Sequence, residues 1–272
     1  MTVSCYLQGT AKGDEIVRMF AKGSKGKLAN NTDYIKTRSL DSDPVFLWGC
    51  LRGSDLILKQ CLETSHEFYY GDNCYYGNKA YLRITHNGLQ NTKFTPRQSD
   101  RFIQNPINIK PWRKTGSRII IFPPTESFAH IFNKQNWLED TICRLKEYTD
   151  RPIYVRYKPA ETKIGWENGY MINAGHIKRP DASKLSLTEE LEDAWAVVAF
   201  QSSAVWEAIA QGVPAFVDPI NAASVMGNTD ISTIETPMLD DQEKHFWHIN
   251  YCQFTREEIS NGTAWRIVNG HG

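Results

Sequence analysis

The polar residues best placed for chemistry in this 272-residue chain are two neighbouring serines, Ser202 and Ser203. They follow an apolar run at 196–200 and precede a helical pattern at 204–211 that ends at Gly212. An apolar run without alternation is typical of a strand buried on both faces of a parallel sheet. The serines would then lie at the carboxyl edge of that sheet, where free N–H groups and the helix dipole favour an anion. The pattern predicts a phosphate site; the alternative is a serine that only caps the helix.

Charged and hydroxyl side chains also lie at the ends of other strands predicted in the second half of the chain. Thr125 follows the strand at 118–122, and Arg156 and Lys158 end the strand at 152–157. Because carboxyl ends of parallel strands meet at one edge, we expect these side chains near the serines. Cations and fixed hydrogen-bond donors of this kind stabilise a diphosphate leaving group.

Glu207 lies one turn into the helix that follows the serines, where its carboxylate can accept hydrogen bonds from ribose or sugar hydroxyls. The alternative for Glu207 is an ion pair with a neighbouring helix. For Arg156 and Lys158 the alternative is ordinary surface charge.

A second polar group belongs to the aromatic segment at 69–77, which follows the strand predicted at 67–70. Asp72 is a candidate general base for transfer to a hydroxyl group, because neighbouring tyrosines can raise the pKa of its carboxyl. His86 is the other candidate base, and its alternative is a turn residue beside Asn87. The sequence leaves open which of the two is the base.

A metal site is not expected. Asp41-Ser42-Asp43 formally matches an Asp-x-Asp metal motif, but it precedes Pro44 instead of ending a strand, so we interpret it as a turn. The six cysteines are scattered, with no Cys-x-x-Cys pair and no histidine at ligand spacing.

Two sets of alternating strands and helices are needed to position these residues, which predicts an α/β fold with parallel sheets. The Lys- and Gly-rich segment at 22–27 predicts a flexible loop, and 240–254 predicts a helix. The other expected strands lie at 3–7, 45–48 and 215–217, and the other helices at 14–20, 54–64, 136–148, 187–193 and from 255.

Charge is unevenly distributed although the chain is neutral overall. Residues 1–118 carry 18 Lys and Arg against 10 Asp and Glu, whereas the remainder carries 13 against 21. A basic loop at 93–117, with three prolines and interleaved aromatic residues, suits a linker and also nucleic acid. We therefore expect an acceptor-binding unit at 1–117, including that loop, and a second unit at 118–240. The loop's candidate contacts are Lys93, Arg97, Arg101, Lys110, Arg113 and Lys114.

No apolar run approaches the roughly 20 residues that cross a bilayer. The first residues lack the basic start and apolar core of a signal peptide. We expect a cytoplasmic monomer with no membrane partner.

The second half resembles the donor-binding domain of GT-B glycosyltransferases. The resemblance rests on Pro-Pro-Thr at 123–125, Arg-Tyr-Lys-Pro at 156–159, Ser-Ser-Ala-Val-Trp-Glu at 202–207 and Gly-Val-Pro at 212–214. It implies two Rossmann-like lobes whose parallel sheets face across a cleft, with helices at 241–272 packing back on the first lobe. It also implies a UDP-sugar as co-substrate and no further cofactor.

The segments 70–77, 81–88 and 245–255 are similar to bacteriophage glycosyltransferases that decorate 5-hydroxymethylcytosine in DNA. This resemblance implies that Arg83 and Asn87 grip a DNA phosphate or an extruded base. A base within a duplex must leave the stack or be reached through the major groove.

Together these features predict a hexosyltransferase that moves a sugar from a UDP-sugar to the hydroxymethyl group of a modified pyrimidine, 5-hydroxymethylcytosine or 5-hydroxymethyluracil, in double-stranded DNA. One alternative is transfer to a surface glycan or lipid-linked acceptor. The other is a non-catalytic DNA-binding protein with a GT-B-like fold. The sequence does not specify the sugar, the anomer, the DNA context or which modified base is the acceptor.

Overall fold

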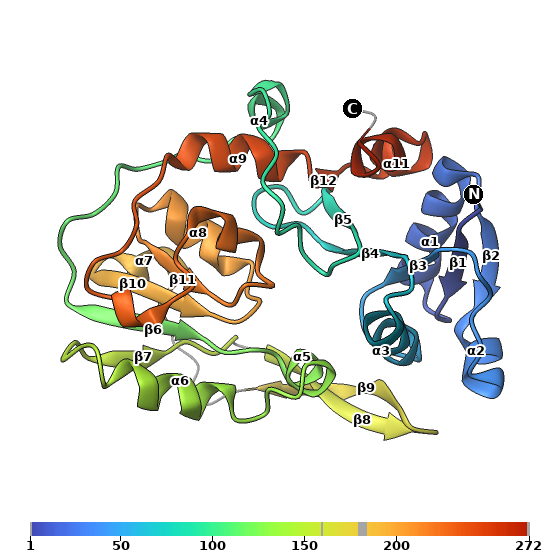
Figure 1. The fold of residues 1–272 in the computed structure, drawn as a ribbon, viewed down its shortest axis with the longest axis horizontal. Helices are drawn as coiled ribbons and strands as arrows, with labels where there is room; N and C mark the ends of the chain where they lie inside the picture. The colour runs from blue at the N-terminus through green and yellow to red at the C-terminus, as the bar shows by residue number, and fades with distance from the viewer. Residues whose placement is uncertain (1, 159, 179–183, 271–272) are drawn as a thin grey trace.

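The computed structural model describes residues 2–158, 160–178 and 184–270. Its strands form a six-stranded sheet (sheet A), a four-stranded sheet (sheet B) and a two-stranded hairpin, with helices packed around the sheets (Figure 1). The prediction of an α/β chain with parallel sheets is confirmed, because most strand pairs in sheet A and all in sheet B are parallel.

Sheet A belongs mainly to the first half of the chain and has the order β12-β5-β4-β3-β1-β2. Strands β2, β1, β3 and β4 are parallel, whereas β5 runs antiparallel to β4 and β12 antiparallel to β5. Because β2 and β3 lie on opposite sides of β1, the sheet has a topological switch point between β1 and β3, where ligands of open α/β sheets bind. The strands are β1 (Ser4–Leu7), β2 (Lys27–Asn30), β3 (Val45–Trp48), β4 (Phe68–Asn73), β5 (Leu82–His86) and β12 (Gln253–Phe254).

Sheet B belongs to the second half and has the order β11-β10-β6-β7. Its strands are all parallel, and β7 and β10 flank β6, which gives a second switch point between β6 and β10. The strands are β6 (Arg118–Phe122), β7 (Ile153–Val155), β10 (Ala194–Ala199) and β11 (Ala215–Val217).

Helices cover both faces of each sheet through four buried apolar clusters. Phe20 of the first helix packs on sheet A together with the last two helices, whereas Ile57 of the third helix packs on its other face. On sheet B, Trp206 packs on one face and Leu145 on the other. The helices are α1 (Ala11–Ser24), α2 (Asn31–Thr37), α3 (Ser54–Thr64), α4 (Asp100–Gln104), α5 (Glu126–Ile131), α6 (Trp137–Leu145), α7 (Leu187–Leu191), α8 (Ala204–Ala210), α9 (Gln242–Asn250), α10 (Arg256–Ser260) and α11 (Thr263–Val268), with 3₁₀ turns η1 (Ala222–Met226) and η2 (Ile231–Thr233).

Two expectations about the local structure were wrong. The segment at 22–27 is not a flexible loop. Helix α1 continues to Ser24 and is capped by Lys25, whose backbone is left-handed (φ 57°), and β2 already starts at Lys27. Strand β2 is an edge strand with three exposed residues of four, so no apolar pattern marks it. The helix expected over 240–254 ends at Asn250, and β12 follows.

A hairpin of β8 (Ala160–Glu167) and β9 (Tyr170–Lys178), which we call the strap hairpin, has no counterpart among the predicted elements. In the chain it lies between β7 and β10 of sheet B, but it binds the first half, where the Arg52 N–H donates to the Met171 carbonyl at 2.7 Å. In return the Met171 N–H donates to the buried Asp55 carboxylate at 2.9 Å. The strap hairpin therefore ties the two halves together on one side.

The halves are also joined by an aromatic insertion. Tyr75 and Tyr76, in the loop after β4, are buried in the main apolar cluster of the second half. The Tyr75 ring lies edge-on to Trp206, with ring centroids 6.4 Å apart, and the Tyr76 ring lies edge-on to Phe246 at 5.1 Å. The loop after β4 of sheet A thus packs into the core of the second half.

This packing predicts the stability of a Tyr76 variant. Tyr76→Ala removes a buried ring and the hydroxyl that pairs with Asn250, so we expect the free energy of unfolding to fall by about 3–5 kcal/mol. Urea denaturation followed by fluorescence measures this change. Tyr148→Ala, at a 41% exposed tyrosine, is the control and should change stability by less than about 0.5 kcal/mol. Equal losses in the two variants would contradict the burial of Tyr76 in the core of the second half.

Candidate functional site

The carboxyl edges of sheets A and B face one cavity of about 330 Å³, which we call the interlobe cavity. The ends of β1, β3 and β4 line it from sheet A, and residues after β6 and β7 line it from sheet B. Three residues predicted from the sequence, Asp72, Thr125 and Lys158, come together there. The remaining lining residues are Gln8, Trp48, Gly49, Cys50, Leu51, Arg52, Tyr70, Asn73, Ser127, Phe128, Glu161 and Thr162.

Asp72 is held in a fixed orientation at the end of β4. Its Oδ2 accepts hydrogen bonds from Arg83 Nη2 at 2.8 Å and from the Tyr70 hydroxyl at 3.2 Å, and its Oδ1 accepts the Asn73 N–H at 2.7 Å. The preceding Gly71 leaves room for the side chain of Trp48 on the neighbouring strand β3, since a Cβ there would lie 2.9 Å from the Trp48 ring. The carboxylate is therefore positioned by the sheet and not by a free loop.

Arg83 connects the two halves beneath this cavity. It pairs with Asp72 across the antiparallel β4–β5 ladder, and its Nη1 donates to Ser203 Oγ at 3.2 Å. The side chain is only 4% exposed, and within the described residues its Nε has no hydrogen-bond partner. The expectation that Arg83 grips a DNA phosphate is corrected by this placement, because the guanidinium is buried and already paired.

The structure places the serine pair at the start of α8. Ser203 occupies the N-cap position of α8 in the right-handed helical conformation (φ −70°), and no cap hydrogen bond of its side chain is seen in the described structure. Ser202 Oγ instead accepts the Ala204 N–H at 3.3 Å. The Ser203 hydroxyl meets Arg83, so the serine pair lies next to the Asp72 network instead of only capping a helix.

Arg156 and Glu207 lie near one another, and Arg156 already has partners within the protein. Arg156 forms an ion pair with Glu190 and donates to the Leu185 carbonyl at 3.2 Å. Burial raises the pKa of the Glu207 carboxyl, and the positive charges of Arg156 and Lys79 oppose that rise. Lys158, by contrast, is exposed at the interlobe cavity.

The interlobe cavity also contains Cys50, a residue to which the sequence assigned no chemistry. Burial raises the pKa of the Cys50 thiol to about 12. Because a thiolate and not a thiol is the nucleophile, Cys50 is suited to packing and not to covalent catalysis at neutral pH.

His86 and Asn87 lie away from Asp72. Strand β5 reverses direction, so its end pairs with the start of β4, where His86 lies opposite Tyr69. The His86 ring stacks on Tyr69 at 4.5 Å and bonds Glu67 Oε1 through Nε2 at 2.8 Å. Asn87 has a left-handed backbone (φ 52°), and its Oδ1 accepts the Phe68 N–H at 3.0 Å. Because β5 runs antiparallel to β4, the two candidate bases, Asp72 and His86, lie at opposite edges of sheet A.

The basic segment at 93–117 does not line the interlobe cavity. Arg101 is buried, pairs with Glu258 and donates to the carbonyls of Asn250 and Gln253. Arg113 donates to the carbonyls of Gln211, Leu191 and Glu192. These two arginines hold the fold together, which corrects the expectation that they contact DNA.

The lysines of that segment are divided between two places. Lys110 and Lys114 are exposed, and the Lys110 N–H bonds the Ala210 carbonyl at the end of α8, which is the amino edge of sheet B. Lys93 lines a different pocket together with Arg97. The structure thus separates the predicted DNA contacts from the predicted donor site.

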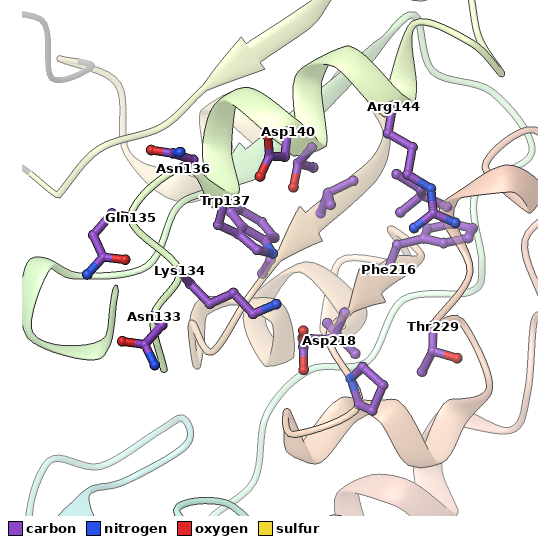
Figure 2. Close-up of a pocket in the computed structure, with 16 residues that line it drawn as sticks. Asn133, Lys134, Gln135, Asn136, Trp137, Asp140, Arg144, Phe216, Asp218 and Thr229 are labelled. Carbon is purple, nitrogen blue, oxygen red and sulfur yellow. The ribbon is translucent and has the colours of Figure 1, made fainter. Parts of the chain in front are cut away.

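A second hollow, of about 460 Å³, lies on the α6 side of sheet B at the ends of β10 and β11 (Figure 2). The Lys134 and Asp218 side chains point toward one another there, Trp137 forms a wall and Arg144 enters from the far end (Figure 2). None of the described residues that line it was predicted to bind a ligand. The available signal was Asp218 at a strand end, whereas the α6 residues come together only through folding.

No group of three His, Cys, Asp or Glu side chains that could hold a metal ion occurs among the described residues. Within the same part of the chain, no helix is long and apolar enough to cross a membrane.

Comparison with known proteins gives structural neighbours only. No protein-family model and no curated protein matches the sequence. One similar solved structure is the beta Kdo 2,4 transferase KpsC of Thermosulfurimonas dismutans, with 12% identity over 91% of this chain and 90% of that chain and a TM-score of 0.48. Another is the beta Kdo 2,7 transferase KpsC of the same organism, with 13% identity over 99% of both chains and a TM-score of 0.47. At this level of similarity neither structure informs the substrate of this chain.

The buried pair of Arg101 and Glu258 predicts a stability effect. Arg101→Ala leaves Glu258 without its partner and should lower the free energy of unfolding by about 3 kcal/mol at pH 7. Denaturant unfolding measures the loss. Lys114→Ala, at an exposed lysine of the same segment, should change it by less than about 0.5 kcal/mol.

The same pair sets a pH dependence. Burial raises the pKa of Glu258, but hydrogen bonds and the charge of Arg101 outweigh burial and lower it overall. A carboxyl with a lowered folded-state pKa stabilises the fold above its unfolded value of about 4.3, and this stabilisation is lost as the pH falls through the folded value. The difference between wild type and Arg101→Ala should therefore shrink below about pH 4. A difference that stays constant from pH 7 to pH 3 would contradict the role of this pair.

Proposed function

We propose that this chain is a glycosyltransferase that transfers a sugar from a nucleotide sugar to an acceptor hydroxyl in the interlobe cavity. The observation that carries the proposal is the meeting of Asp72 from sheet A with Thr125 and Lys158 from sheet B in one cavity. Carboxyl edges at topological switch points are where open α/β sheets bind ligands, and here two such edges face each other.

In the proposed reaction Asp72 acts as the general base. Its Oδ1, the oxygen not bonded to Arg83, takes the proton of the acceptor hydroxyl. The hydroxyl oxygen then forms a bond to the anomeric carbon of the sugar, and the bond between that carbon and the phosphate oxygen breaks. The Arg83 and Tyr70 hydrogen bonds to Oδ2 keep the carboxylate oriented during this step.

The nucleoside diphosphate leaves with the bonding electrons and carries the developing charge. Lys158 supplies a cation for it, and the hydroxyls of Thr125 and Ser203 supply hydrogen bonds. Arg156 and Glu207 belong to the same donor site in this proposal, Glu207 accepting from sugar or ribose hydroxyls. The cavity lining supports the roles of Thr125 and Lys158, and the Arg83 link to Asp72 supports that of Ser203. Arg156 and Glu207 do not line the interlobe cavity, and their roles come from the sequence resemblance.

Three finer parts of the proposal come from the sequence resemblance: UDP as the nucleotide, a hydroxymethyl pyrimidine in double-stranded DNA as the acceptor, and no further cofactor. A monomer that works in the cytoplasm is carried over from the pattern of apolar residues in the sequence. A hydroxyl of a glycan or a lipid-linked sugar is the second candidate acceptor. It is favoured by the finding that Arg101 and Arg113 are engaged within the fold and that Lys110 lies at the amino edge of sheet B.

Two substitutions separate the proposed base from the donor site. Asp72→Asn removes the base but keeps the shape of the side chain and an oxygen that accepts from Arg83, so transfer should fall at least about 100-fold while UDP-sugar affinity changes less than about 2-fold. Lys158→Ala removes a cation from the leaving group and should weaken UDP-sugar binding about 10-fold or more. Transfer rates and calorimetric binding measure both effects, with Lys36→Ala on α2 as an exposed-lysine control. If Asp72→Asn loses donor binding while Lys158→Ala retains it, the two halves are wrongly assigned.

The acceptor is identified by product mass. Labelled UDP-sugars are incubated with DNA containing cytosine, 5-hydroxymethylcytosine or 5-hydroxymethyluracil, and in parallel with glycan acceptors. We expect a sugar mass on the hydroxymethylated nucleosides and none on cytosine, which lacks the hydroxyl. Labelling of a glycan alone would replace the DNA acceptor with the second candidate, and DNA binding without consumption of any nucleotide sugar would refute the glycosyltransferase.

A further inference from the structure

A further space adjoins the interlobe cavity along the carboxyl edge of sheet A, and we call it the strap hollow. Its volume is about 420 Å³, and it lies between the ends of β1 and β2, the start of α2 and the strap hairpin. Gln8 and Arg52 line both the strap hollow and the interlobe cavity, so the two spaces meet at these side chains. A ligand in the interlobe cavity therefore has Arg52 at its side.

The backbone of Arg52 is fixed in an unusual conformation at this junction. Its φ of 60° lies in the left-handed region, which residues other than glycine rarely adopt. The Arg52 N–H donates to the Met171 carbonyl at 2.7 Å, and the Arg52 carbonyl accepts from Asn31 Nδ2 at 2.8 Å. These two bonds, one to the strap hairpin and one to α2, fix the place from which the side chain starts. An arginine thus stands where the backbone favours glycine, and strain of this kind is concentrated at functional sites.

The guanidinium of Arg52 is available to a ligand. The residue is half-buried, and in the part of the chain that the structure describes its side chain has no hydrogen bond and no ion pair. In this it differs from Arg83, Arg101 and Arg113, whose guanidinium groups bond partners within the fold. A partly buried cation without a counter-charge is unfavourable, and a negatively charged group on a ligand removes that cost.

Four carboxylates line the two spaces, and none of them pairs with Arg52 within the described residues. Asp14 accepts two backbone N–H groups just after β1, at 2.9 and 3.1 Å, and Asp72 is paired with the buried guanidinium beneath the cavity. Glu161 accepts a backbone N–H at the start of α5 at 3.2 Å, and Glu167 is exposed. The counter-charge for Arg52 is therefore left for a ligand to supply.

Lys12 of α1 adds a second cation on the sheet A side of the interlobe cavity. Its Nζ donates to Asn73 Oδ1 at 3.2 Å and lies 5.6 Å from the centroid of the Trp48 ring, and both partners line the cavity. Lys158 enters from sheet B, where the proposed reaction uses it for the leaving group. The cations of sheet A lie on the side of Asp72, which is the side of the acceptor, and the leaving group does not need them.

We infer that the acceptor carries an acid group, a carboxylate or a phosphate, beside its reacting hydroxyl, and that Arg52 binds this group while Asp72 takes the hydroxyl proton. The inference rests on the proposed glycosyl transfer and specifies the charge of its acceptor. A guanidinium matches two oxygens of either acid group with parallel hydrogen bonds. Because its backbone is fixed, Arg52 sets the distance between acid group and hydroxyl, and so acts as a specificity-determining residue.

Matched acceptors that differ only in the acid group test this inference. 5-Hydroxymethyldeoxycytidine is compared with its 5′-monophosphate, and methyl glucoside with methyl glucuronide, by calorimetric binding to the full chain. We expect the charged member of at least one pair to bind about 10-fold or more tightly than its neutral partner. A preference in the nucleoside pair identifies a phosphate, and a preference in the sugar pair identifies a carboxylate. Equal binding within both pairs would overturn the inference.

Two substitutions at the same position separate the charge of Arg52 from its packing. Arg52→Gln and Arg52→Lys both keep a long polar side chain at the left-handed position, so their urea midpoints should agree. Arg52→Gln should abolish the preference for the charged acceptor, Arg52→Lys should retain part of it, and Lys36→Gln on the exposed face of α2 should leave it unchanged. A preference that survives in Arg52→Gln would also overturn the inference.

The same acceptors distinguish this inference from the proposed function. Each is incubated with labelled UDP-sugars, and the products are identified by mass. A charge preference in binding without transfer to any acceptor would refute the glycosyl transfer and leave Arg52 as the acid-group site. Transfer at equal rates to charged and neutral members of both pairs would support the transfer and refute the role of Arg52.

Discussion

The buried guanidinium of Arg83 is the interaction on which the arrangement of the two halves depends. A charge with 4% exposure is tolerated only when it is paired, and its partners come from both halves: Asp72 in sheet A and Ser203 at the start of α8. Strand β5 must run antiparallel to β4 to bring Arg83 opposite Asp72. The same pair thus fixes the edge of sheet A, the orientation of the proposed base and the position of the serine turn.

Most of the fold could be predicted because its central strands are apolar without interruption. Strands β3, β6 and β10 are buried on both faces and were recognisable in the sequence. Edge elements could not be predicted in the same way. Strand β2 is exposed, and the strap hairpin is held by hydrogen bonds of Met171 with the Arg52 N–H and the Asp55 carboxylate, which form only after folding. The direction of β5 was also not encoded in any local pattern, and it moved His86 and Asn87 to the other edge.

The convergence of Asp72, Thr125 and Lys158 on one cavity could be predicted from the order of the strands, whereas the surroundings of the arginines could not. Asp72, Thr125 and Lys158 all follow strands, so their convergence required only the parallel sheets. An arginine in a sequence carries no sign of whether it will be solvated or will bind buried carbonyls and carboxylates. Arg83, Arg101 and Arg113 proved to be of the second kind, because they bond groups that lie far away in the chain.

The double attachment of the two halves has a consequence for how substrates enter. Tyr75 and Tyr76 anchor the halves on one side, and the strap hairpin anchors them on the other through Met171. A hinge rotation of one half against the other would have to break both attachments, so rigid-body domain closure is costly in this molecule. Under the proposed function, exchange of substrate and product at the interlobe cavity is then governed by side-chain and loop motions of nanoseconds to microseconds, which are faster than the microsecond-to-millisecond rotations of hinged domains.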